Sequence, residues 1–281
     1  MRSMYEALPS LPDVEPGTPL PLRKWSTEAP LSLLALDTST DRLSIAVGRW
    51  PAGAAARGEA PRTWAFEGPG AAHSSSTLLP SLLRLLGEAG CTLRELDAVA
   101  FGASPGSFTG LRTACSVAQG LALGAHLPVL PVDTLLAVAE DWRVRQTPVP
   151  PAGLEVWSLL DARMDEMYAA RWRWQPGAQE LPAWSCVADA LLVHPEDLSA
   201  LPGWQPGVPC VGNVAAVYGP RLPVSVMPAM PTAEAMLRLA PALLAQSAAV
   251  DAALALPRYV RDKVAQTTAE REAARAAAAE H

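Results

Sequence analysis

The chain carries one pattern of apolar and polar positions twice. Residues 33–50 read as a buried apolar strand, an acidic turn and a second strand with alternating apolar positions. The pattern returns 124 residues later, over 157–174. Identical residues occupy matched positions in the two copies: Leu36 and Leu160, Asp37 and Asp161, Asp41 and Asp165, Ala46 and Ala170, Arg49 and Arg173, Trp50 and Trp174. The repeat predicts two lobes of similar design.

The pattern after the first copy predicts the architecture of each lobe. We expect a third strand near 62–66, a leucine-rich helix over 77–89, a strand over 98–102 and a helix that begins at Phe108. A three-stranded meander followed by alternating helix and strand predicts an α/β fold, with a mixed sheet covered by helices. Its duplication is the organisation of the actin-like and Hsp70 ATPase (ASKHA, ribonuclease H-like) fold. The expected boundaries are a Pro-rich extension over 1–30, a first actin-like lobe over 31–141, a linker over 142–153, a smaller second lobe over 154–264 whose C-terminal segment returns to the first, and an Ala-rich tail over 265–281.

A glycine-rich turn precedes the helix that begins at Phe108. Gly102, Gly106 and Gly110 allow a close approach of the backbone, and Ser107 is placed to cap the helix. A P-loop would need Gly-Lys-Ser/Thr at the end of this turn, but the chain has only two lysines, Lys24 and Lys263. The sequence therefore excludes a P-loop nucleotidase here.

Carboxylates at the ends of the repeated strands are the main candidates for chemistry. Asp37, followed by three hydroxyl residues, could form a phosphate loop, but the same residues satisfy an ordinary hairpin turn, which we favour. Asp161 and Asp165 could hold metal ions, as in ribonuclease H-like nucleases, yet Arg163 between them favours a local ion pair. The histidines lack the spacing of metal ligands, and no nucleophile elbow is present. We predict no catalytic residue and no metal site.

Composition narrows the function classes further. The net charge of -6 argues against a basic face for nucleic acid, so any nucleic-acid role is expected to run through a partner. Residues 1–30 lack the uninterrupted apolar run of a secretory signal, and glycines and prolines interrupt the apolar stretch 113–132. We therefore expect a cytoplasmic protein that does not span a membrane. The four cysteines show no C-x-x-C spacing and are expected to be reduced core thiols.

Two helices carry more apolar surface than one sheet contact covers. The leucine-rich helix has two adjoining stripes, and the helix from Phe108 has few polar residues. A fully buried leucine gains about 1.5–3 kcal/mol, so leucines left in water would be a sizeable loss. A pair of helices from a partner would cover the surplus; the alternative is a covering helix from the same chain.

Several runs together resemble the TsaB (YeaZ) family. These runs are LALDTSTDRLSIAV, HSSSTLLPSLLRLL, AFGASPGSFTGLRTACSVAQGLALG, PVDTLLAVA, LLDARMDEMYAA and PRYVRDKVA, and they span residues 33–265. The resemblance implies a non-catalytic subunit with two actin-like lobes. It would dimerise with and activate TsaD, the catalytic subunit that forms threonylcarbamoyladenosine (t6A) at position 37 of tRNA, with a TsaE-like ATPase in the assembled complex. The metal-binding H-x-x-x-H motif of TsaD has no counterpart over 131–140, where the chain has no histidine.

The resemblance also implies where the subunits meet. The two apolar helices would pack against their equivalents in the partner, through residues matched approximately as His73, Leu78, Leu79, Leu82, Leu86, Leu111, Arg112 and Val117. Residues assigned either to a nucleotide or to a turn are Asp37, Thr38, Gly106, Ser107 and Gly110. One departure from the family pattern is Ser104, where relatives commonly have glycine.

Alternatives remain open at this point. The chain could be a partner-independent ATPase or an M22-type protease of the same fold, or a homodimer that uses the same helices. The sequence also leaves open whether a nucleotide binds at the partner interface. It does not tell whether Arg258, Arg261 and Lys263 touch tRNA or a neighbouring lobe.

Overall fold

The first lobe is built on a five-stranded mixed sheet. The computed structural model describes residues 26, 28–70, 74–146, 151–176 and 182–261. The strands of this sheet lie in the order β3-β2-β1-β4-β5, with β1 to β3 antiparallel and β4 and β5 parallel to β1. They comprise β1 (Leu31–Asp37), β2 (Arg42–Trp50), β3 (Arg62–Pro69), β4 (Ala98–Ser104) and β5 (Val129–Asp133).

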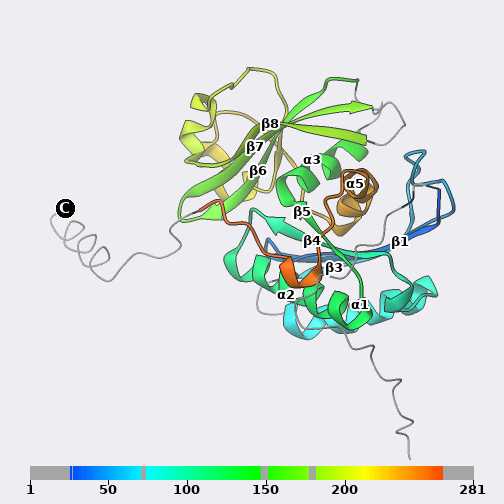
Figure 1. The fold of residues 1–281 in the computed structure, drawn as a ribbon. Coiled ribbons are helices and arrows are strands. Elements are labelled where there is room, and N and C mark those ends of the chain that lie inside the picture. The colour runs from blue at the N-terminus through cyan, green and yellow to red at the C-terminus, as the bar shows by residue number, and fades with distance from the viewer. Residues whose placement is uncertain (1–25, 27, 71–73, 147–150, 177–181, 262–281) are drawn as a thin grey trace, which may run out of the picture.

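Helices cover both faces of this sheet because its central strands are apolar on both sides. One face packs against α1 (Ser74–Ala89) and α2 (Phe108–Ala125), which lie on the same side in Figure 1. The other packs against α3 (Thr134–Val144) and α5 (Ala233–Ala245). The cap positions follow the sequence: the Ser107 hydroxyl accepts from the Gly110 N–H at 3.5 Å, and Asp133 accepts from the first turn of α3. A short 3-10 turn, η2 (Leu93–Glu95), precedes β4.

The second lobe repeats the meander on a second mixed sheet, in the order β10-β9-β6-β7-β8. The antiparallel hairpin of β6 and β7 corresponds to that of β1 and β2, as the sequence repeat predicts. Helical elements here are short. The elements are β6 (Glu155–Arg163), β7 (Glu166–Pro176), β8 (Pro182–Val193), η3 (Pro195–Ala200), β9 (Cys210–Gly212), α4 (Ala215–Tyr218), η4 (Gly219–Arg221) and β10 (Val226–Pro228).

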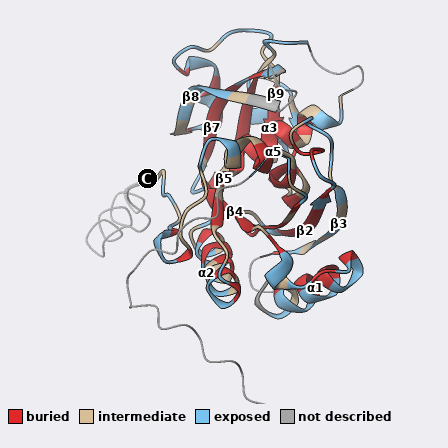
Figure 2. Ribbon diagram, turned by 45° about the vertical axis from the view of Figure 1, so that its right-hand side comes forward, coloured by how far each residue is buried: buried red, intermediate tan, exposed pale blue. Residues whose placement is uncertain are grey.

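A shared core joins the two lobes. One cluster of buried residues contains side chains of β1, α3 and α5 together with Val156, Leu160 and Tyr168 of the second sheet. In Figure 2 the buried residues of α3 and α5 lie between the two sheets. Helix α3 runs to Val144 and buries Trp142, so the expected linker over 142–153 begins inside a helix, and residues 147–150 lie outside the described residues.

The chain returns to the first lobe after the second sheet. Helix α5 packs on β1 and β2, and η5 (Ala252–Leu254) packs on α2. Among the described residues, each helix is too short or too polar to cross a membrane. Cys91, Cys115 and Cys210 are buried, but Cys186 is exposed on β8, so the prediction of four core thiols is wrong for Cys186.

Candidate functional site

Asp37 ends β1, and its Oδ2 lies 1.9 Å from where a Cβ at Gly102 of β4 would be. Its side chain is 1% exposed. Oδ1 accepts hydrogen bonds from the Ser39 N–H at 3.0 Å and the Ser39 hydroxyl at 2.8 Å, whereas the buried Oδ2 has no hydrogen-bond partner among the described residues. Burial raises the pKa of Asp37 to about 7, although the hydrogen bonds from Ser39 lower it. These are the contacts of a hairpin turn, with one carboxylate oxygen unused.

The glycine-rich turn is occupied by the chain's own backbone. The Thr38 hydroxyl donates to the Gly110 carbonyl at 2.6 Å, and the Ser107 N–H donates to the Ser39 carbonyl at 2.7 Å. A Cβ at Gly110 would lie 1.9 Å from the Thr38 carbonyl oxygen, and one at Gly106 would lie 2.6 Å from the Ser39 Cβ. The glycines therefore admit the β1–β2 turn, which fills the space beside the N-terminus of α2.

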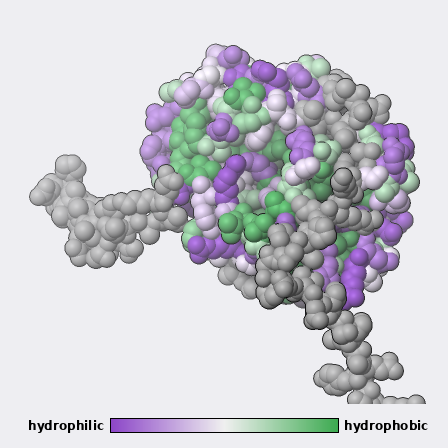
Figure 3. All heavy atoms as spheres, in the orientation of Figure 1, coloured by the Kyte–Doolittle hydropathy of each residue, from purple (hydrophilic) through white to green (hydrophobic). Residues whose placement is uncertain are grey.

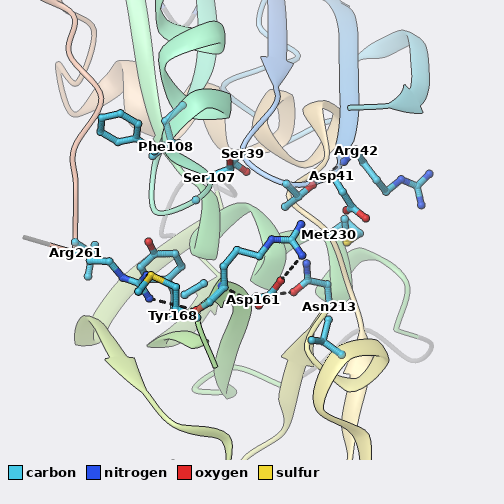
Figure 4. Close-up of a pocket in the computed structure, with 18 of the residues that line it drawn as sticks. Ser39, Asp41, Arg42, Ser107, Phe108, Asp161, Tyr168, Asn213, Met230 and Arg261 are labelled. Carbon is cyan, nitrogen blue, oxygen red and sulfur yellow. Dashed lines mark hydrogen bonds and ion pairs between the residues drawn. The ribbon is translucent and has the colours of Figure 1, made fainter. Parts of the chain in front are cut away.

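A pocket of about 510 Å³ lies between the lobes. Figure 4 shows Ser39, Ser107 and Phe108 of the first lobe facing Asp161, Tyr168 and Asn213 of the second across it. Its size is in the range of small-molecule sites. The remaining lining residues include four arginines at its edges, Arg42, Arg163, Arg258 and Arg261.

The carboxylates of the second repeat are paired with groups of this chain. Asp161 forms an ion pair with Arg163 at 3.1 Å and accepts from the Tyr218 hydroxyl at 2.8 Å. Asp165 forms an ion pair with Arg221. The local ion pair predicted from the position of Arg163 is confirmed. No cluster of three metal-ligating side chains exists among the residues that the structure describes.

The arginines at the pocket's edge are paired in the same way. Arg258 contacts Asp133 at 3.1 Å, and Arg261 pairs with Glu166 of the second lobe. Burial raises the pKa of Asp133 to about 6. Of the alternatives left open for Arg258 and Arg261, contact with a neighbouring lobe is the one that these ion pairs show. Lys263 lies outside the described residues.

The residues predicted for the partner contact separate into buried and exposed groups. Leu79 is 46% exposed, Arg112 is exposed and Val117 is half-buried. Four others are buried: Leu78, Leu82 and Leu86 lie in the core against the first sheet, and Leu111 lies at the inter-lobe pocket. The stripe of α1 that is richest in leucine faces the sheet, so these four residues offer little exposed surface, and their contact with a partner stays a prediction. His73 lies outside the described residues.

Two further exposed apolar residues lie outside the set predicted for the partner contact. Leu83 on α1 is 65% exposed and Leu123 on α2 is 51% exposed. The face of the molecule in Figure 3 shows separate hydrophobic patches among hydrophilic residues. Sequence reasoning missed Asn213 and Tyr259 at the pocket, and Tyr218, whose hydroxyl donates to Asp161, because no local motif marks residues that only the fold brings together.

Comparison with known proteins gives consistent matches. The family model for TsaD, tRNA N6-adenosine threonylcarbamoyltransferase, matches residues 70–191. The chain is 32% identical to the Escherichia coli "tRNA threonylcarbamoyladenosine biosynthesis protein TsaB" over 84% of this chain and 96% of that protein. It is 40% identical to the Haemophilus influenzae protein of the same name, over 49% of this chain and 52% of that protein.

Solved structures give the same result. The crystal structure of a Pseudomonas aeruginosa protein with similarity to peptidase YeaZ superimposes with a TM-score of 0.67 at 32% identity, over 82% of this chain and 100% of that chain. A structure of YeaZ from Pseudomonas aeruginosa gives a TM-score of 0.66 at the same identity. On its sequence and its fold, the chain belongs to the TsaB (YeaZ) family.

Proposed function

We propose that this chain is a non-catalytic subunit in the synthesis of t6A in tRNA, docking onto and activating a TsaD-type catalytic subunit. The observation that carries the proposal is the 32% identity to the Escherichia coli TsaB protein over 96% of that protein's length. The two sheets with their duplicated meander support the actin-like (ASKHA) classification.

The site geometry supports a non-catalytic role. The β1–β2 turn, the candidate phosphate loop, packs against the glycine-rich turn, and the carboxylates of the second repeat are paired with Arg163 and Arg221. The chain is therefore proposed to need no cofactor of its own, with a TsaE-like ATPase joining the complex. Purified chain that hydrolyses ATP, or cleaves protein, without a partner and in a manner dependent on Asp37 would contradict this assignment.

The exposed sides of α1 and α2 are the proposed docking face. It is formed by Leu79, Leu83, Arg112, Val117 and Leu123, of which Leu83 is the most exposed leucine. An exposed apolar side chain gains free energy when a partner helix removes it from water. A homodimer through the same helices would compete with the heterodimer, because one surface would serve both.

The first prediction tests this face. Mixing the purified chain with the TsaD-type subunit and measuring mass by light scattering is expected to show a heterocomplex. Leu83→Glu should weaken the complex by about 10-fold or more without changing the melting temperature, because a charge replaces an exposed apolar contact. Val187→Glu, at a residue 39% exposed on β8 in the second lobe, is the matched control and should bind normally.

A cellular measurement completes the test. In cells lacking their own copy of the gene, the wild-type chain should restore t6A, as measured by mass spectrometry of digested tRNA, and Leu83→Glu should restore less. Equal binding and equal t6A for Leu83→Glu and Val187→Glu would remove α1 from the docking face. Absence of any heterocomplex with the wild-type chain would overturn the proposed function.

A further inference from the structure

Residues 250–261, which we name the C-terminal strap, run along α2 and then cross to the second lobe. In Figure 1 the strap is the orange and red segment that leaves η5 beside α2 and rises to the end of the second sheet. Val250 exchanges backbone hydrogen bonds of 2.8 and 2.9 Å with Val129 of β5. The Gln119 side chain on α2 donates to the carbonyls of Ala252 and Ala255, both at 3.0 Å.

The far end of the strap contacts both lobes. The Tyr259 ring lies 5.1 Å from the Phe108 ring, and its hydroxyl accepts from Arg112 at 2.9 Å. Arg261 then pairs with Glu166 and donates to the Arg163 carbonyl at 3.4 Å, both at the β6–β7 turn. The strap therefore covers one side of α2 and closes one edge of the inter-lobe pocket, whose lining includes Tyr259 and Arg261.

Around η5 the strap places its alanines inward and its leucines outward, whereas Val250 and Val260 near its ends are half-buried against the core. Ala252 and Ala255 are 3% and 1% exposed, whereas Leu254 and Leu256 are 65% and 73% exposed. Hydrophobic free energy is proportional to the apolar area buried, so two alanines hold the strap far less than two leucines would. Segments with few buried apolar contacts open at a lower free energy than the core. Around η5 the strap is therefore attached mainly by hydrogen bonds, and its ends are attached by half-buried Val250 and Val260, the Tyr259–Phe108 ring contact and ion pairs.

We propose that the C-terminal strap is a detachable cover, which opens as a unit while both lobes stay folded and uncovers the side of α2 formed by Phe108, Arg112, Cys115 and Gln119. The regulatory part of this inference rests on the proposed function: if α2 docks the partner, the closed strap competes with the partner for this side of α2. Release of the strap then exposes this side of α2 to the partner, and closure of the strap blocks it.

Native cysteines supply the probe. Cys115 lies under the strap, 3% exposed, with its thiol 3.5 Å from the Ala255 carbonyl oxygen. Cys91 and Cys210 are buried elsewhere and report on unfolding of the lobes. With N-ethylmaleimide and mass spectrometry, Cys115 of the wild-type chain is expected to react about 10-fold or more faster than both, as local opening requires. Equal rates at all three buried thiols would overturn the proposal.

Two variants of neighbouring strap residues sharpen the test. Ala255→Glu places a charge against α2 and should accelerate labelling of Cys115 by about 10-fold or more, because burying an unpaired charge is costly. Leu256→Glu adds the same charge at an exposed position and should leave the rate unchanged. If Ala255→Glu accelerates Cys115, Cys91 and Cys210 together, the strap is part of the cooperative core and the proposal is wrong.

Arg261→Gln, which keeps the side chain polar and releases the pair with Glu166, provides a milder variant that leaves α2 intact. It should raise both Cys115 labelling and the affinity for a TsaD-type subunit by a few-fold. If Cys115 labelling rises but no complex forms, the docking function is refuted and the proposal of a detachable strap still stands. A complex whose affinity is unaffected, with Cys115 as inert as Cys91, would refute the cover and leave the docking function intact.

Discussion

At the scale of single residues, the protonation of Asp37 is coupled to the stability of the fold. Its pKa is raised from 3.8 to about 7, so the folded chain holds this proton more tightly than the unfolded chain. The stabilisation is therefore complete below the unfolded pKa and is lost as pH rises through about 7. We expect the free energy of unfolding to fall by up to about 1.4 kcal/mol per pH unit across this interval.

Asp37→Asn isolates this effect. The amide can still accept from Ser39 but does not ionise, so the variant should show a smaller decline in urea stability between mildly acidic and neutral pH. Asp133, whose pKa is raised to about 6, adds to the pH dependence of stability in the same direction. Because Asp133 is present in both proteins, its contribution cancels when their profiles are subtracted. Identical pH profiles for the two proteins would show that the Asp37 carboxyl does not titrate in this interval.

Two glycines of α2 lead to opposite predictions. Gly110→Ala would place a Cβ 1.9 Å from the Thr38 carbonyl oxygen, so backbone must move, and we expect a loss of about 2 kcal/mol or more. Gly120→Ala meets no atom within 4 Å and should gain about 0.5–1 kcal/mol from lower chain entropy. Urea unfolding of both variants measures the contrast; equal effects would mean that the close approach at Gly110 is not rigid.

At the scale of elements, periodicity predicted the parts but not which face of each helix is covered. The repeat predicted both hairpins, and the cap at Ser107 predicted the start of α2. The glycines of the turn indicated a close approach, but only the fold shows that the neighbour is the β1–β2 turn.

The helices show the limit of periodicity most clearly. On α1, Leu82 and Leu83 are adjacent leucines, yet one is fully buried and the other is 65% exposed. The angle at which the helix packs on the sheet determines which of the two leucines is buried, and that angle cannot be derived from a single sequence. The sequence did not predict how the strap packs either. Its alanines face inward and its leucines outward, against the usual pattern of burial.

At the scale of the whole molecule, a buried ion pair on α3 ties the lobes into one cooperative unit. Glu140 is fully buried and accepts two hydrogen bonds of 2.7 Å from Arg143. It also accepts from the indole N–H of Trp184 on β8, at 2.9 Å, so a carboxylate of the first lobe holds the edge strand of the second. Removing one partner of a buried pair leaves an uncompensated charge.

Glu140→Ala should therefore cost about 3–5 kcal/mol, because it leaves Arg143 and the Trp184 indole N–H without their buried acceptor. Removal of Glu88, whose pair with Arg84 is exposed on α1, should cost less than about 1 kcal/mol. Urea unfolding followed by circular dichroism and by tryptophan fluorescence tests both stability and coupling. Since one buried cluster spans both sheets, the two probes should give one coincident transition for the wild-type chain. Separate transitions would show that the lobes unfold independently, and Glu140 would then stabilise a contact between lobes rather than a common core.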